Sequence, residues 1–420
     1  MAEVAAGLWA AEEVVSTGVQ AGAAGYAVAK PTMPLKAVFA QIASTTDDAS
    51  RSSLSRSHHS LTIVDNRAYV FGGQISHNEL ASTNIHSLAL PIKGSTAPDY
   101  QVLPAISAAP DGPLPVARTK HAACALGSRI AIHGGCDDKG SLIDEGSKVW
   151  LYDTEKSAWD VTEAGSHPER VPPPRSMASM LAHDGNLVLY GGLDASGSPM
   201  TDVWYFNVFT KVWNQLPQAP VAASSAALAG NTLYIIARGD NLSSEVHHLS
   251  MDMYAETPPT WSSTSFPTNP LAPGPRSRSN GGLIPVTTGY GRNYLLYFFG
   301  DRQGDAETSD TPQWSDLWTF QLPSSDPEMK ASLSMAEAIK PAKIKDQIRS
   351  KLGADTGGSS WAEVEVQPPG DLQAHAGKAH PGPRSSFGYD VAPDGKSVVM
   401  WGGVDAEGKV EGDGWIIELS

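Results

Sequence analysis

A short run of β-forming residues that ends in a pair of glycines recurs along the chain and constrains the fold more than any other feature. Four clear copies are AYVFGG (68–73), IAIHGG (130–135), LVLYGG (187–192) and VVMWGG (398–403). Two degenerate copies, LYIIARG and LLYFFGD, end at Gly239 and Asp301. Such self-similarity is typical of repeat architectures, in which each copy is one supersecondary unit. The sequence therefore predicts six units.

Further marks recur in phase with the glycine pairs. Downstream of each pair comes a polar residue, then an aromatic residue or His two places on, then an apolar residue two further on, as in Asp202, Trp204 and Phe206. This period of two predicts a strand. A fourth strand with a Trp follows in the middle copies. Upstream of every run except the fourth stands an arginine, and the five are Arg56, Arg118, Arg175, Arg276 and Arg384.

The two ends of the chain are expected to meet. The last copy ends at Ser420 after its third strand, and the strand-like segment 35–43, LKAVFAQIA, has no repeat of its own. Pairing the two would remove both exposed sheet edges.

The recurring pattern of double Gly, Trp and Arg resembles kelch repeats, a family whose fold is a β-propeller. The resemblance implies an all-β chain: a six-bladed kelch-type β-propeller over 35–420, closed by an N-terminal strand and carrying small helical decorations.

Two segments lie outside the repeat. Residues 1–34 form an Ala-rich leader, for which we expect helix, and residues 326–352 interrupt the fifth copy with apolar residues at helical spacing. Strand connectivity predicts that both lie on one face, the bottom, which leaves the opposite face, the top, open. The leader followed by an entry strand also resembles stand-alone fungal kelch proteins, some of which accompany secondary-metabolite pathways.

Charge and composition exclude several classes of function. The net charge of −15 argues against the basic surface that binding the phosphate backbone of a nucleic acid requires, so we expect no nucleic-acid partner. No run of 18 apolar residues and no secretory signal is visible, so we expect no membrane partner and a cytoplasmic, monomeric protein. The cysteines, Cys124 and Cys136, are predicted to face Ala131 and Thr119 in one hairpin, which makes a disulfide between them unfavourable.

The top face is the predicted site. In a kelch blade the first strand starts at the top and the second ends there, so the arginines and the loops after the glycine pairs should converge. Arg278 and Lys120 are the preferred ligand contacts because most other copies lack a basic residue at their slot. The alternative for each recurring arginine is an ion pair with a loop aspartate. The catalytic candidates are His58, Lys120, His121 and Arg278. The predicted ligand-binding residues are Arg56, Gln74, Arg118, Lys120, Arg175, Asp194, Asp240, Arg276, Arg278, Arg302, Arg384 and Phe387.

Two functions remain open at this stage. The first is a binding module whose top funnel holds an anionic or phenolic small molecule or a protein partner, since guanidinium groups grip planar oxyanions. The second is a cofactor-independent enzyme of fungal secondary metabolism that cyclises or isomerises a polyketide-like metabolite, for instance by intramolecular hydroalkoxylation with His, Lys and Arg assistance. No cofactor is expected, and no metal, because the histidines lack ligand partners at suitable spacing.

Overall fold

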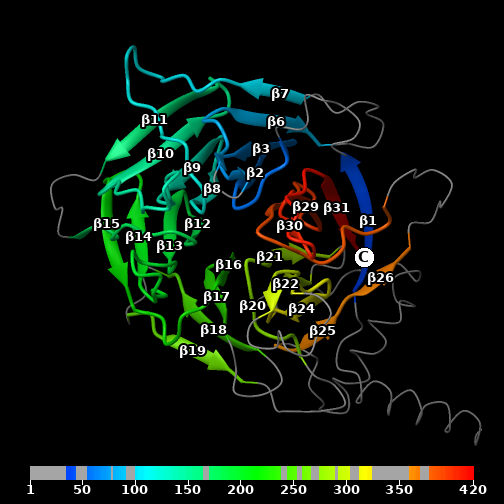
Figure 1. Cartoon of the computed structure of the whole chain (residues 1–420). Coiled ribbons are helices and arrows are strands. Elements are labelled where there is room, and N and C mark those ends of the chain that lie inside the picture. Colours follow the sequence, from blue (N-terminus) through cyan, green and yellow to red (C-terminus); the bar gives the residue numbers. More distant parts are fainter. Residues whose placement is uncertain are drawn as a thin grey trace, which may run out of the picture.

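The computed structural model describes residues 35–43, 54–76, 79–90, 100–163, 170–237, 244–252, 258–265, 274–288, 292–302, 312–323, 359–368 and 378–420. These residues form strands, turns and loops, with no α-helix among them. The helices expected within 1–34 and 326–352 lie outside the described residues, and so does Asp240. The fold is the predicted six-bladed propeller, with six sheets arranged around one axis (Figure 1).

Each blade is an antiparallel sheet whose first strand lies nearest the axis (Figure 1). Blade 1 contains β2 (Ser60–Val64), β3 (Arg67–Phe71), β6 (Ile85–Ala89) and β7 (Tyr100–Leu103). Blade 2 contains β8 (Ala122–Leu126), β9 (Arg129–His133), β10 (Lys148–Asp153) and β11 (Ala158–Glu163). Blade 3 contains β12 (Ser179–His183), β13 (Asn186–Tyr190), β14 (Val203–Asn207) and β15 (Val212–Leu216).

The remaining blades follow the same order. Blade 4 contains β16 (Ser225–Ala229), β17 (Thr232–Ala237), β18 (Glu245–Ser250) and β19 (Trp261–Thr264). Blade 5 contains β21 (Gly282–Thr287), β22 (Asn293–Phe298), β24 (Leu317–Gln321) and β25 (Trp361–Glu363). Blade 6 contains β28 (Gly388–Val391), β29 (Ser397–Trp401) and β31 (Gly414–Leu419). Short ribbons extend three blades at the top: β4 (Gln74–Ser76) with β5 (Glu79–Leu80), β20 (Arg278–Ser279) with β23 (Asp301–Arg302), and β27 (Arg384–Ser385) with β30 (Val404–Asp405).

The closing strand joins the two ends of the chain as predicted. Strand β1 (Lys36–Ala43) pairs antiparallel with β31, so that Ala37 lies opposite Leu419 and Phe39 opposite Ile417. Blade 6 has a fifth strand that the sequence did not predict: β26 (Glu365–Gln367) runs parallel to β1 on its outer side. Covering the outer edge in this way removes unpaired backbone groups that could template aggregation.

The core lies between the blades, where apolar residues of neighbouring sheets interdigitate. The largest apolar cluster combines residues of blades 5 and 6 with Phe39 from β1. Close approach of adjacent blades explains the glycine pairs. Gly72 has a φ of +64°, and a Cβ atom there would lie 2.6 Å from the Arg118 carbonyl oxygen of the next blade. The repeat signature is thus a requirement of blade packing.

Candidate functional site

The recurring arginines are buried inside the scaffold. Arg175 is 1% exposed, and its guanidinium donates to both oxygens of Asp202 at 2.8 and 2.7 Å and to the Gly191 carbonyl at 2.9 Å. The indole Nε1 of Trp204 donates to the same carboxylate at 2.6 Å. Burial acts to raise the pKa of Asp202, but Arg175 and Trp204 reverse this and hold it below its usual value. The group is therefore a closed hydrogen-bonded cluster.

Three other blades build the same cluster of arginine, acid and tryptophan. Its members are Arg118, Glu145 and Trp150 in blade 2, Arg278, Asp316 and Trp318 in blade 5, and Arg384, Asp413 and Trp415 in blade 6. In blade 1, Arg56 Nη2 lies 2.9 Å from His86 Nε2. All five arginines are at most 1% exposed. Four of them meet an acid, in most cases the residue just before the third strand of the same blade, and Arg56 meets His86.

The structure corrects one assignment in blade 5. The recurring position belongs to Arg278, whose Nη1 donates to the Phe299 carbonyl, as Arg175 does to Gly191. Arg276, predicted for that position, is exposed. Arg278, which was expected to contact ligand, is buried and pairs with Asp316. The prediction chose Arg276 because it follows a proline and precedes a serine, as Arg175 and Arg384 do.

The top loops are also held by their own contacts. Oδ1 of Asp194 accepts hydrogen bonds from the backbone N–H groups of Ser196 and Ser198, and Asp137 and Asp405 close equivalent D-x-x-G turns in blades 2 and 6. Asp194, a predicted ligand contact, therefore stabilises its loop. Among the other predicted contacts, Gln74 pairs with Ser57 through backbone hydrogen bonds, and Arg302 Cζ lies 3.6 Å from the Trp314 ring centroid. Phe387 is buried and lines the axial cavity described below.

A rim of backbone hydrogen bonds surrounds the axis at the top. In five blades the residue two places after the recurring arginine takes part in this rim. The Ser386 N–H donates to the Asn280 carbonyl, and the His58 N–H donates to the Ser386 carbonyl. The Lys120 N–H donates in turn to the His58 carbonyl, and the Met177 N–H donates to the Lys120 carbonyl. All five have φ near +55°. Two of them are the predicted catalytic candidates His58 and Lys120. Burial and the charge of Lys120 lower the pKa of His58 to about 4, so His58 is a weak base at neutral pH.

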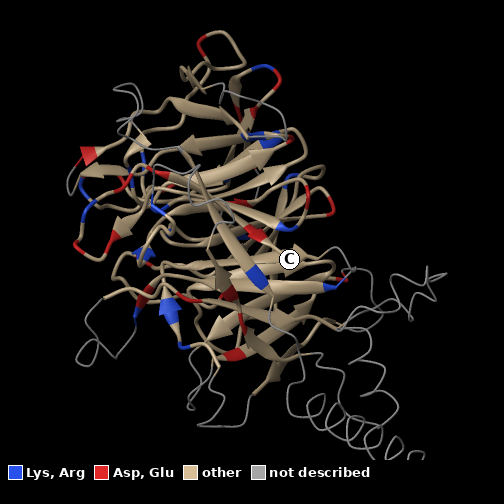
Figure 2. Ribbon diagram, turned by 90° about the vertical axis from the view of Figure 1, so that its right-hand side faces the viewer, with Lys and Arg blue, Asp and Glu red and all other residues tan. Residues whose placement is uncertain are grey.

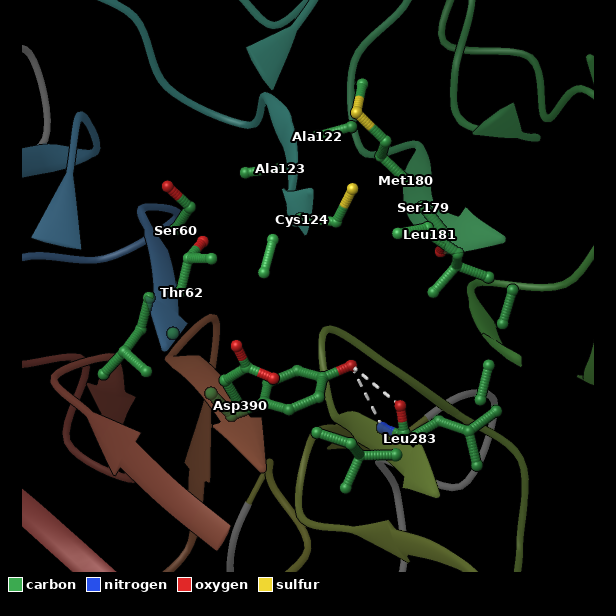
Figure 3. Close-up of a pocket in the computed structure, with 18 of the residues that line it drawn as sticks. Ser60, Thr62, Ala122, Ala123, Cys124, Ser179, Met180, Leu181, Leu283 and Asp390 are labelled. Atoms are coloured by element: carbon green, nitrogen blue, oxygen red, sulfur yellow. Dashed lines mark hydrogen bonds between the residues drawn. The ribbon is translucent and has the colours of Figure 1, made fainter. Parts of the chain in front are cut away.

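A cavity of about 480 Å³ lies between the six first strands (Figure 3). Its walls are mainly small or apolar, and the larger apolar side chains are Leu61, Met180, Leu181, Leu228, Leu283, Ile284 and Phe387. Polar groups are few: Ser60, Thr62, Ser179, Cys124, His59, His121, Tyr389 and Asp390. Of the predicted catalytic candidates, only His121 lines this cavity. Its Nε2 lies 2.9 Å from Ser60 Oγ, and burial lowers its pKa to about 3.

Asp390 is the residue that sequence reasoning missed. Its carboxylate lies at the wall of the cavity (Figure 3), and burial raises its pKa to about 6. The strand pairings place it at the level where the other first strands carry Thr62, Cys124, Leu181, Ala227 and Ile284. The available signal was this contrast: one blade has a carboxylate where the other five have none.

The described residues contain no group of three or more His, Cys, Asp or Glu side chains placed to hold a metal ion. Cys124 and Cys136 are free thiols. Charged side chains of both signs gather in loops and at strand ends, and most of the strand surface is uncharged (Figure 2).

Comparison with known proteins identifies the family. Residues 58–300 match the model described as the KLHDC2/KLHL20/DRC7 Kelch-repeats domain, which covers more than half of the chain. This chain belongs to the kelch-repeat family. A kelch propeller supports a binding function in general. The structure also resembles the solved "Structure of YjhT", with a TM-score of 0.54 over 87% of this chain and 97% of the other, at 11% sequence identity. That likeness concerns the fold alone.

Curated relatives share only segments with this kelch chain. "Kelch domain-containing protein 3" of Homo sapiens is 25% identical over 38% of this chain and 40% of its own length. "Adagio-like protein 3" of Oryza sativa subsp. japonica is 28% identical over 53% and 35%, and the flagellar outer arm dynein alpha chain of Chlamydomonas reinhardtii is 24% identical over 46% and 4%. The chain thus spans less than half the length of each of these relatives.

No helix among the described residues is long and apolar enough to span a membrane.

Proposed function

We propose that this kelch propeller is a small-molecule binding module and that the axial cavity is its binding site. One observation carries the proposal: the cavity of about 480 Å³ combines an aliphatic wall with a few polar groups. Ligand sites have this character, with volumes of roughly 300–1,000 Å³ and a small number of placed polar groups. The funnel of arginines that the sequence suggested does not support an anionic ligand, because four of those guanidinium groups meet a carboxylate inside the blades and the fifth, Arg56, is buried against His86.

The test is to fill the cavity. Cys124 lines it on β8, so Cys124→Trp would occupy much of the space, and Val102→Trp on the outer strand β7, where the side chain is 46% exposed, serves as the size-matched control. Binding of a library of molecules with about 10–20 non-hydrogen atoms would be measured by native mass spectrometry and calorimetry. We expect hits for the wild type and the control and at least a tenfold loss in the filled variant. Hits that bind all three proteins equally would place the site elsewhere and refute the proposal.

A second candidate is a cofactor-independent cyclase or isomerase of the kind suggested by the resemblance to fungal kelch proteins. One observation favours it: the pKa of Asp390, raised to about 6, suits proton transfer near neutral pH. The histidines proposed from the sequence are too acidic for that role, and Arg278 is committed to Asp316. If the cavity is catalytic, Asp390→Asn should abolish turnover of a bound metabolite while binding persists, and unchanged turnover would exclude this role.

A further inference from the structure

The cavity contains one charged group that no other wall residue balances. Among the described residues that line it, Asp390 is the only carboxylate, and no Lys or Arg is present. The remaining titratable groups are Cys124, Tyr389, His59 and His121. Burial and the Asp390 charge raise the pKa of Cys124 and of Tyr389, and burial lowers the pKa of both histidines, so all four are uncharged at neutral pH.

The hydrogen bonds of Asp390 leave acceptor capacity facing the cavity. Oδ2 accepts from the Ile63 N–H at 2.7 Å and Oδ1 accepts from the Val391 N–H at 2.8 Å. A carboxylate has about four acceptor positions, so roughly two remain. An ionised carboxylate in a partly desolvated site is unfavourable unless a donor or a cation meets it. The cavity is therefore better suited to receiving positive charge than negative charge.

His59 is a second polar group of the cavity wall that is open to a hydrogen bond. The side chain is 7% exposed and lines the cavity, yet neither ring nitrogen has a hydrogen-bond partner among the described residues. Buried polar groups in native proteins are almost always paired, and a ligand in the cavity would supply a partner for this ring. The ring lies against Gly388, where a Cβ atom would be only 2.7 Å from His59 Nε2.

Gly388 and Asp390 are two places apart on β28 and therefore face the same side. The imidazole and the carboxylate are thus two polar points on one wall, separated by about 7 Å along the strand at ~3.3 Å per residue. Leu181 of blade 3 lies on the opposite part of the wall (Figure 3). A ligand that satisfies this wall needs a donor at one point, a second hydrogen-bonding group at the other, and an apolar body.

We propose, as an extension that rests on the proposed binding function, that the cavity selects a compact cationic amine, whose protonated amino group pairs with Asp390 and whose second polar group reaches His59. The apolar body of the amine would lie against the aliphatic wall. The net charge of −15 favours the approach of a cation in addition. The ligand class is therefore opposite in charge to the anionic class that the arginines suggested in the sequence.

The test uses matched triplets in which only the head group changes: 4-phenylbutylamine, 4-phenylbutanol and 4-phenylbutyrate, with naphthyl and cyclohexyl counterparts to sample body size. Calorimetry at pH 7.5 should show at least one amine that binds at least tenfold more tightly than its alcohol, and its carboxylate should bind most weakly. In Asp390→Asn the preference for amine over alcohol should fall below about threefold, while the alcohol retains its affinity within about twofold. Asp194→Asn, the same change in a top loop, should leave all affinities unchanged.

The pH dependence gives a second readout that needs no variant. Asp390 gains a proton as pH falls through about 6, so the affinity of the amine should fall at pH 5.0 while that of the alcohol does not. If Asp390→Asn does not fold, this comparison decides the matter. If an alcohol or a carboxylate binds as tightly as its amine, and if its binding is lost in the Cys124→Trp variant, the amine inference is overturned and the binding function still stands. A wild type that binds no member of any triplet and no library molecule would overturn both.

Discussion

The arginine clusters and the cavity carboxylate place charge inside the same propeller in opposite ways. Arg384 and Asp413 are 0% and 6% exposed and meet each other, with the Gly402 carbonyl and the Trp415 indole completing the cluster. Asp390 is half-buried at the cavity wall, and two backbone N–H groups are its only described hydrogen-bond donors. The first arrangement recurs in four blades, whereas the second occurs once.

This difference teaches how to separate scaffold from site in a repeat protein. A charged residue that recurs in phase with the repeat has a structural role. It joins the segment before the first strand of its blade to the third strand of the same blade. A charged residue that occurs at one blade only, at a level where the others have neutral side chains, is not required by the fold. Removing charge should therefore destabilise the protein at the clusters and stabilise it at Asp390.

The largest effect should come from opening the scaffold. Deleting residues 1–43 removes β1 and exposes the outer edge of β31, so we expect aggregation or failure to fold. Deleting only residues 1–34 retains β1 and serves as the control. Size-exclusion chromatography and thermal unfolding of the two proteins compare them directly. A monomeric protein of unchanged melting temperature after the longer deletion would show that the closing strand is dispensable.

Loss of one recurring arginine should have the next largest effect. Arg278→Ala leaves Asp316 without its ion-pair partner, and we expect a loss of about 3–5 kcal/mol in the free energy of unfolding, as for other broken buried pairs. Arg276→Ala, two residues away and exposed, should leave the denaturation midpoint unchanged. Urea titrations of both variants provide the measurement. If the two variants lose similar amounts of free energy of unfolding, burial of the side chain does not separate the structural role of Arg278 from that of Arg276.

The third effect concerns the tryptophan of a cluster. Trp204→Phe keeps an aromatic ring in the core but removes the indole N–H that donates to Asp202. A hydrogen bond to a charged group is worth about 1.5–3 kcal/mol, so the loss should be about 2 kcal/mol and smaller than that of the arginine variant. If Trp204→Phe proves as damaging as Arg175→Ala, the tryptophan rather than the arginine organises the cluster.

The smallest effect is expected in the loops. Asp194→Ala removes a carboxylate that holds its own turn at the protein surface. We expect a small decrease in melting temperature and no change in the affinity of any cavity ligand. A loss of binding without loss of stability would instead return Asp194 to the ligand site, as the sequence suggested.

The sequence was sufficient for the architecture because blade packing imposes strict local demands. The glycine pairs recur since a side chain at Gly72 or Gly402 would collide with the neighbouring blade, and such demands are visible in one chain. The closing strand followed from counting strands. These features belong to the repeat, and a repeat can be recognised without knowing how the chain folds.

The site could not be predicted in the same way. Arg276 shares the Pro-Arg-Ser context of Arg175 and Arg384, so the sequence pattern favoured it. The structure instead places Arg278 at the recurring position, 21 residues before its carbonyl partner Phe299, whereas Arg175 sits 16 before Gly191. Asp390 appears at an equivalent level only after the strand pairings are known. Its environment depends on Ile63, more than 300 residues away in the chain, and no local pattern reports that contact.

The most direct test of the central claim is the pH dependence of unfolding for Asp390→Asn and the wild type without ligand. The folded-state pKa of Asp390 is about 6 against an ordinary value of 3.8, so its ionisation destabilises the folded protein progressively as pH rises from about 4 to above 6. The buried histidines act equally in both proteins and cancel in the difference. The account predicts that Asp390→Asn is more stable than the wild type at pH 7.5 and that the difference vanishes near pH 4. A variant less stable than the wild type at pH 7.5 would show that Asp390 is part of the scaffold and would contradict the account.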